Sequence, residues 1–227
     1  VLGEGPACAQ GINLPARGVS GDFFDIMPLA DGRIYVNVGD VAGKGINAAM
    51  IMARTASVFR CLGKEEPDPA RLLARINREL CETGIPGMFV TMVAALYDPV
   101  ARQITVANAG HEPPLLHDPA AGTFTELEAA APPLGIDPAL VTEDTLATDV
   151  VSLDGRAFYC FTDGLTEGKR EDGSMLGTEG VRELIAGHAV LPPEERVEGV
   201  VARLHRGEAP LFDDITLLVV DGAESAE

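Results

Sequence analysis

The chain has 227 residues, 46% of them hydrophobic, which is enough to bury the core of one large domain. Its formal charge of −18, from 35 acidic and 17 basic residues, argues against nucleic acid or an anionic membrane as the main partner, because both require a basic surface. No apolar run approaches the roughly 20 residues of a membrane-spanning helix, so we expect no membrane insertion by this segment.

The first half of the chain predicts a β-hairpin followed by two helices. Residues 21–29 and 33–41 are apolar, β-rich runs joined by Ala30-Asp31-Gly32, and Asp-Gly is a strong hairpin signal. From residue 46 the period becomes helical, and the predicted helix ends near Leu62 with a buried stripe of Ile46, Ala49, Met50, Ala53, Ser57 and Cys61. A second helix starts at Asp68-Pro69, a cap followed by a first-turn proline, and buries Leu72, Leu73, Ile76 and Leu80.

The second half is richer in strands. Residues 89–98 and 103–110 predict another hairpin, 118–150 are poorly periodic with short strands, and 156–164 form a buried strand. Two helices follow, with apolar faces of Val181, Leu184, Ile185 and His188 and of Val197, Val200, Val201 and Leu204. The chain then closes on a strand at 215–222. Because the strands pair mostly with sequence neighbours, we expect two antiparallel sheets with helices outside them.

No internal repeat and no long linker divides the chain, so residues 1–227 are expected to form a single domain. No basic signal-peptide region is visible at the start of the sequence. Residue 1 is Val rather than an initiator Met, so we expect a segment of a longer protein. Three of the four cysteines (Cys61, Cys81 and Cys160) lie in apolar segments, as buried free thiols do, which favours a reducing, cytoplasmic setting. Neither the cysteines nor the four histidines are spaced for a zinc site.

The stretch VGDVAGKGINAAM at residues 38–50 admits two interpretations. A phosphate-binding P-loop would need one more residue between its glycines, and Gly45 stands where that motif requires Ser or Thr. Asp40, directly after the first glycine, would also repel a phosphate. A nucleotide-binding switch is therefore the weaker interpretation, and Asp40 itself becomes the candidate functional residue.

Several other aspartates stand beside a glycine or at a strand end, as Asp40 does. They are Asp22, Asp163, Asp213 and Asp214. Strand ends of a sandwich can converge on one rim, and clustered carboxylates suit hard cations such as Mg²⁺ and Mn²⁺. The alternative is that each Gly-Asp or Asp-Gly pair is simply a turn, and spacing alone leaves both readings open.

The residues match a known family in four ordered blocks, which read VSGDFFDIMPLADGRIYVNVGDVAGKGINAAMIMA, FVTMVAALYDPVARQITVANAGHEPPLL, FYCFTDGLTEGKREDG and FDDITLLVV. They resemble the SpoIIE/RsbU-type serine/threonine phosphatases, a bacterial branch of the metal-dependent, type 2C-like (PPM) protein phosphatases. The resemblance runs from about Leu14 to Val220. It implies an α+β fold, an α-β-β-α sandwich of two antiparallel sheets with a two-metal site on one rim.

The resemblance also implies a set of site residues. Two Mn²⁺ or Mg²⁺ ions are implied, with Asp40 as the carboxylate shared between them. The other implied ligands are Asp22, the Val41 backbone carbonyl, Asp163 and Asp213. Asp214 is the less favoured member of the terminal pair, and Asp25 is weaker still because its odd offset from Asp22 puts it on the other strand face. Arg17 is the candidate phosphate-binding residue, with an ordinary surface arginine as the open alternative. For Asn108, Gly110 and His111 we favour a hairpin-end turn with a hydrogen-bonded histidine, and for Lys44 a role at the turn or in partner contact.

The function implied is hydrolysis of phosphoserine or phosphothreonine on a STAS-domain anti-sigma-factor antagonist, within a partner-switching pathway. Asp22 and Asp40 are the residues expected to matter most for catalysis, and no covalent phosphoenzyme is required. Relatives often carry sensor domains ahead of this one and act as homodimers, so both are expectations of the resemblance. The alternative is a catalytically weak, phosphatase-like regulatory binding module.

Overall fold

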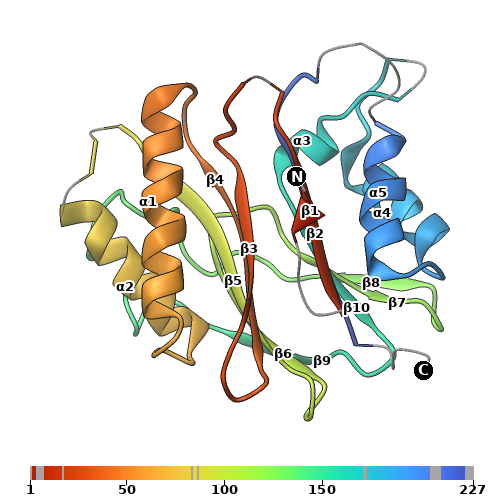
Figure 1. The fold of residues 1–227 in the computed structure, drawn as a ribbon, viewed down its shortest axis with the longest axis horizontal. Coiled ribbons are helices and arrows are strands. Elements are labelled where there is room, and N and C mark those ends of the chain that lie inside the picture. The colour runs from red at the N-terminus through yellow and green to blue at the C-terminus, as the bar shows by residue number, and fades with distance from the viewer. Residues whose placement is uncertain are drawn as a thin grey trace.

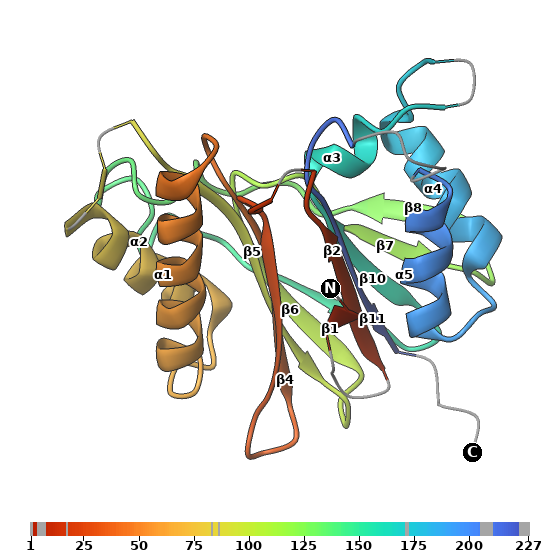
Figure 2. The same ribbon diagram turned by 45° about the horizontal axis from the view of Figure 1, so that its top comes forward.

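The structure is a computed structural model that describes residues 2–3, 8–16, 18–82, 84–85, 87–170, 173–204 and 211–222. Two antiparallel β-sheets pack face to face, with helices on both outer faces (Figure 1). The turned view separates the two halves, α1 and α2 covering one sheet and α4 and α5 the other (Figure 2). The predicted α+β sandwich is confirmed. Among the described residues, no helix combines the length and apolar character needed to cross a membrane.

The first sheet has the order β3-β4-β5-β6-β9. Its strands are β3 (Phe23–Pro28), β4 (Ile34–Val41), β5 (Val90–Asp98), β6 (Gln103–Ala109) and β9 (Asp149–Ser152). Its helices are α1 (Ile46–Leu62) and α2 (Pro69–Glu82). Both predicted hairpins are confirmed, since β3 pairs with β4 and β5 with β6. The predicted cap of α2 is also confirmed, because the Asp68 carboxylate accepts a hydrogen bond from the Ala70 amide at 2.9 Å.

The second sheet has the order β1-β2-β11-β10-β7-β8. Its strands are β1 (Leu2–Gly3), β2 (Ala9–Leu14), β7 (Leu115–Asp118), β8 (Thr123–Glu126), β10 (Ala157–Phe161) and β11 (Ile215–Asp221). The helices of this half are the single turn α3 (Asp163–Thr166), α4 (Gly177–His188) and α5 (Pro193–Ala202). Within α4 and α5 the predicted apolar faces are confirmed, with Val181, Ile185, Val197, Val200 and Val201 all buried.

Alternation along the strands divides the interior into layers. On β4, Val36 and Val38 belong to the apolar cluster between the sheets, whereas Tyr35 and Val41 belong to the cluster beneath α1 and α2. Cys160 lies between the sheets, fully buried as predicted. Cys61 does not follow the prediction, because it lies on the exposed side of α1.

Helix α1 has the predicted bounds but buries a different face. The residues facing the sheet are Ala48, Thr55 and Phe59, whereas Ile46 and Met50 are 78% and 64% exposed. The predicted stripe consisted mostly of small side chains, which drive burial weakly. Phe59, by contrast, packs edge-on against Tyr35 with ring centroids 5.5 Å apart, and this large contact orients the helix.

Strand β2 was not predicted, although it pairs with β11 along its whole length. Gln10, Gly11 and Asn13 dilute its apolar pattern, so the sequence did not read as a strand. Gly11 is required by packing, because a Cβ there would lie 2.4 Å from the Phe24 ring of the facing sheet.

Candidate metal centre

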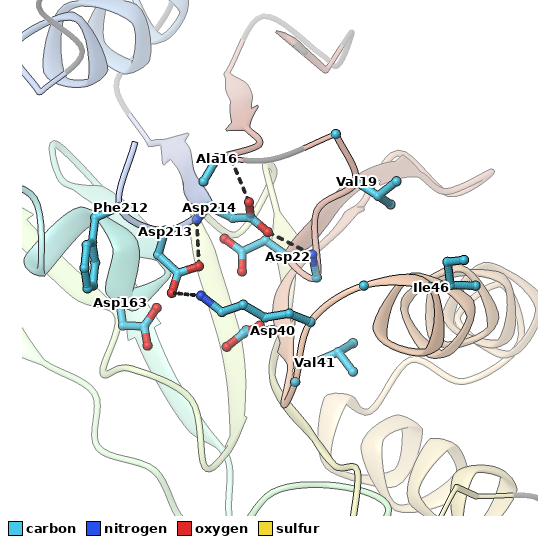
Figure 3. A pocket seen from close by; sticks show the side chains of 15 residues that line it. Ala16, Val19, Asp22, Asp40, Val41, Ile46, Asp163, Phe212, Asp213 and Asp214 are labelled. Atoms are coloured by element: carbon cyan, nitrogen blue, oxygen red, sulfur yellow. Dashed lines mark hydrogen bonds and ion pairs between the residues drawn. The ribbon is translucent and has the colours of Figure 1, made fainter. Parts of the chain in front are cut away.

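One pocket, of about 590 Å³, collects the predicted aspartates at the rim where the two sheets meet (Figure 3). Asp22 immediately precedes β3 and Asp40 is the next-to-last residue of β4, so the first sheet supplies two carboxylates. The second sheet supplies the others, since Asp163 follows β10 and Asp213 and Asp214 precede β11. Residues nearly 200 positions apart in the chain therefore face one another across the sandwich.

Asp22 is the most deeply buried carboxylate of the pocket, with 6% of its surface exposed. Its Oδ2 accepts two hydrogen bonds, from the Thr162 hydroxyl at 2.6 Å and the Thr216 hydroxyl at 2.9 Å. Burial raises the pKa of Asp22 to about 8, the two hydroxyls partly offset this, and the neighbouring charge of Asp40 adds to it. The side chain is therefore held in place and holds a proton near neutral pH.

Thr162 and Thr216 were missed by the sequence reasoning. They stand next to the predicted ligands, in Thr162-Asp163 and in Asp214-Ile215-Thr216, and this adjacency is the signal that could have found them. The Thr162 hydroxyl also connects the end of β10 to β11, because Thr162 Oγ1 accepts a hydrogen bond from the Thr216 amide at 3.0 Å. Asn13 Nδ2 donates to Thr216 Oγ1 at 2.8 Å, which ties the unpredicted strand β2 to the same network.

Asp40 and the Val41 carbonyl lie together beside Gly21. A Cβ placed on Gly21 would lie 3.4 Å from the Val41 carbonyl oxygen and 3.6 Å from Asp40 Oδ1, so the missing side chain keeps these oxygens open to the pocket. Burial raises the pKa of Asp40 to about 6, the charge of Asp163 raises it further, and a hydrogen bond with Asp22 partly offsets both. Asp40 thus lies at the electrostatic centre of the cluster.

Asp163 begins the turn α3 directly after β10, and burial together with the charge of Asp213 raises its pKa. The next residue, Gly164, explains how the two segments meet. A Cβ on Gly164 would lie 1.8 Å from the Asp214 carbonyl oxygen, a separation that no side chain permits. Glycine at this position lets the chain after β10 touch the chain before β11.

The two neighbouring aspartates before β11, Asp213 and Asp214, make different contacts. Asp214 holds the loop, because its Oδ1 accepts from the Ala16 amide at 2.7 Å and its Oδ2 from the Gly21 amide at 2.9 Å. Asp213 faces the pocket and forms an ion pair with Lys44, Nζ to Oδ2 at 3.0 Å. The lysine of the glycine-rich turn therefore points at a carboxylate, an arrangement unlike that of a nucleotide-binding loop.

The donor set fits a hard divalent cation. It consists of oxygens alone, and the pKa values of Asp22 and Asp40 are raised first by burial and then by neighbouring carboxylates, both of which a bound cation would offset. Within the described residues, however, no three Asp, Glu, His or Cys side chains are already gathered closely enough to hold one ion. Asp213 is engaged with Lys44, so one of the predicted ligands is already paired with a positive charge.

The remaining candidates lie elsewhere or outside the described residues. Asp25 points away from the pocket and forms a bidentate ion pair with Arg60 of α1. His111 is buried, with Nδ1 2.9 Å from the Thr91 hydroxyl and Nε2 3.0 Å from the Phe161 carbonyl, and Asn108 accepts from its amide at 2.9 Å. This is the predicted hydrogen-bonded turn. Arg17, the candidate phosphate-binding residue, lies outside the described residues.

Comparison with known proteins agrees with this architecture. A model of the family described as Stage II sporulation protein E (SpoIIE) matches residues 30–222. The chain belongs to the SpoIIE family. Among curated relatives, the phosphoserine phosphatase RsbU of Bacillus subtilis (strain 168) is 31% identical over 210 residues, which is 92% of this chain and 61% of RsbU. The SpoIIE-family chain thus spans less than two thirds of that relative's length.

Solved structures show the same fold. The SiaA-PP2C domain of Pseudomonas aeruginosa superimposes with a TM-score of 0.77 at 25% identity, covering 93% of this chain and 85% of that domain. RsbX, solved in complex with magnesium, superimposes with a TM-score of 0.69 at 19% identity, covering 93% of this chain and 92% of RsbX. The two antiparallel sheets flanked by helices are thus those of the PP2C-type phosphatases.

Proposed function

We propose that this SpoIIE-family domain is a metal-dependent protein serine/threonine phosphatase. The observation that carries the proposal is the convergence of Asp22, Asp40, Asp163 and Asp213, from both sheets, on one pocket. Burial, and to a smaller extent the charges of neighbouring aspartates, raise the pKa values of Asp22 and Asp40, and a cation in the pocket would offset both effects. The similarity to RsbU, a phosphoserine phosphatase, supports the reaction type.

Two Mn²⁺ or Mg²⁺ ions would be held by Asp22, Asp40, Asp163, Asp213 and the Val41 carbonyl. When bound, such ions activate water and neutralise charge on a phosphoryl group. The protein's own contribution is positional. Thr162 and Thr216 fix the Asp22 carboxylate, Gly21 leaves the Val41 and Asp40 oxygens open, and Asp22 would hold a cation in its ionised form.

The substrate we propose is phosphoserine or phosphothreonine on a STAS-domain anti-sigma-factor antagonist, whose dephosphorylation drives a partner-switching pathway. The pocket supports a protein-borne phosphate, because its carboxylates lie within a rim that includes the exposed side chains of Val19, Ile46 and Phe212. Such a rim can contact residues on either side of a phosphoserine. Arg17 is our candidate for holding the phosphoryl oxygens.

We further infer a single catalytic domain over residues 1–227, acting in the cytoplasm, where its four free cysteines would stay reduced. Sensor domains on the same polypeptide are consistent with the greater length of RsbU. A homodimeric state is part of the proposal on the strength of the family resemblance alone. The weaker alternative is a phosphatase-like binding module. The ion pair between Lys44 and Asp213 favours this alternative, because it engages one of the proposed metal ligands.

Phosphate release tests the proposal. The protein is incubated with p-nitrophenyl phosphate and with a STAS-domain protein phosphorylated on serine, each with and without Mn²⁺. We expect metal-dependent turnover that Asp40→Asn abolishes, and that the exposed hairpin variant Asp31→Asn leaves unchanged. Turnover that is equal without metal, or absent from the phosphoprotein assay with Mn²⁺ present, would refute it. Metal binding without turnover would favour the binding module.

A further inference from the structure

Lys44 is the cation that the described part of the pocket places among its carboxylates. It lies in the turn after β4, between Gly43 and Gly45, whose φ angles are 107° and 87°. These are left-handed conformations that glycine adopts without strain. The turn therefore directs Lys44 across the pocket to Asp213, a residue 169 positions further along the chain.

The Lys44 ammonium contacts Asp213, the member of the Asp213-Asp214 pair whose carboxylate faces the pocket. Asp213 Oδ2 accepts from Lys44 Nζ at 3.0 Å, and Asp213 Oδ1 accepts from the Asp214 amide at 3.0 Å. Both oxygens of Asp213 are thus in use. A cation that approaches Oδ2 competes with the ammonium for that oxygen and is repelled by the ammonium's positive charge.

Lys44 lies near more than one carboxylate. Asp40, Asp163 and Asp213 direct their carboxylates into the same space (Figure 3), and the Lys44 ammonium enters that space where it contacts Asp213. One ammonium therefore partly neutralises a cluster whose members otherwise repel one another. Its side chain is 64% exposed, so solvent is in contact with most of it.

We propose that Lys44 is a displaceable counter-ion of the metal centre: it holds Asp213 in the metal-free protein and has to leave when a divalent cation binds. Lys44 is thus a positioning residue that sets metal affinity through Asp213. The inference rests on the proposed function only in taking these carboxylates as cation ligands. It does not depend on phosphatase activity.

The sign of the effect separates this role from a structural one. Removing Lys44 abolishes the competition for Asp213 and also removes a positive charge that repels the incoming cation, so both changes tighten metal binding. A lysine that merely supported the site would weaken metal binding when lost. The metal-free protein should change in the opposite sense, because Lys44→Gln leaves the carboxylates less neutralised and lowers the melting temperature.

The test is calorimetric titration of Mn²⁺ into the wild-type chain, Lys44→Gln, Lys44→Arg and Lys64→Gln. Lys64 is exposed, so its substitution removes the same charge outside the pocket. We expect the dissociation constant of Lys44→Gln to fall about threefold to tenfold, the range for losing an exposed ion pair and a nearby charge. Lys44→Arg and Lys64→Gln should stay near the wild-type value. The difference between wild type and Lys44→Gln should shrink as salt is raised.

An unchanged or weaker affinity in Lys44→Gln overturns the inference, as does an equal gain in Lys64→Gln. If neither wild type nor Lys44→Gln binds Mn²⁺, both this inference and the metal part of the proposed function fail. If Mn²⁺ binds with the expected pattern but no phosphate is released, the inference stands and the proposed reaction fails.

Discussion

Metal binding to this pocket should be strongly proton-linked. The carboxyl groups of Asp22 and Asp40 have pKa values raised to about 8 and about 6, mainly by burial. If both must ionise to hold a cation, the fall in dissociation constant from pH 6 to pH 8 is about 50-fold from Asp22 and about twofold from Asp40. The combined tightening is about 100-fold, and roughly one and a half protons are released per chain at pH 6.

Calorimetric titration of Mg²⁺ at pH 6, 7 and 8, in buffers of different ionisation enthalpy, measures both the affinity and the protons released. Thr162→Val should move the midpoint of the profile to higher pH, because Asp22 loses a hydrogen bond that stabilises its ionised form. Without metal the sign reverses: a carboxyl group whose pKa is raised on folding destabilises the native state as pH rises from about 4 to about 8. An affinity that changes less than threefold between pH 6 and pH 8 would refute this reasoning.

Three further predictions concern the support of the site. Gly164→Ala should lower the unfolding free energy by about 2 kcal/mol or more and weaken Mn²⁺ binding, because its Cβ would lie 1.8 Å from the Asp214 carbonyl oxygen. The control Gly187→Ala has open space around it and should leave Mn²⁺ binding unchanged in the same titration. Asp213→Asn should weaken Mn²⁺ binding at least about tenfold, whereas Asp214→Asn should mainly lower the melting temperature, since Asp214 holds the Ala16 and Gly21 amides; equal affinity losses would contradict this division. Burial lowers the pKa of His111 to about 4, so the neutral form stabilises the fold above about pH 6.5 and this stabilisation is lost as pH falls toward 4. In urea titrations, the stability advantage of wild type over His111→Gln should narrow by about 2 kcal/mol between pH 7.5 and pH 5. A constant difference would contradict this prediction.

The order of the elements was predictable because most of them carry strong local signals. The Asp31-Gly32 turn, the Asp68 cap and the β-branched run at residues 215–220 each specify an element without tertiary information. The aspartates could be selected because each one stands at the end of such an element. Their convergence on one rim became an expectation only through the family resemblance, since spacing in the chain does not encode how two sheets stack.

What could not be predicted depends on contacts between distant segments. The buried face of α1 is set by Phe59 against Tyr35, a contact that a count of apolar residues along the helix does not include. Strand β2 is stabilised by its neighbour β11 rather than by its own sequence pattern. The hydroxyls on Asp22 come from residues 140 and 194 positions away, so only the folded chain shows that threonines support this carboxylate.

The position of bound Mn²⁺ tests the central claim most directly. Crystals grown with MnCl₂ should show anomalous scattering from two ions in the pocket, both in contact with Asp40 and with Asp22, Asp163 and Asp213 completing their ligands. The Lys44 ammonium should have left Asp213 in that structure. Absence of anomalous density at Asp40, or manganese bound only outside this pocket, would contradict the account.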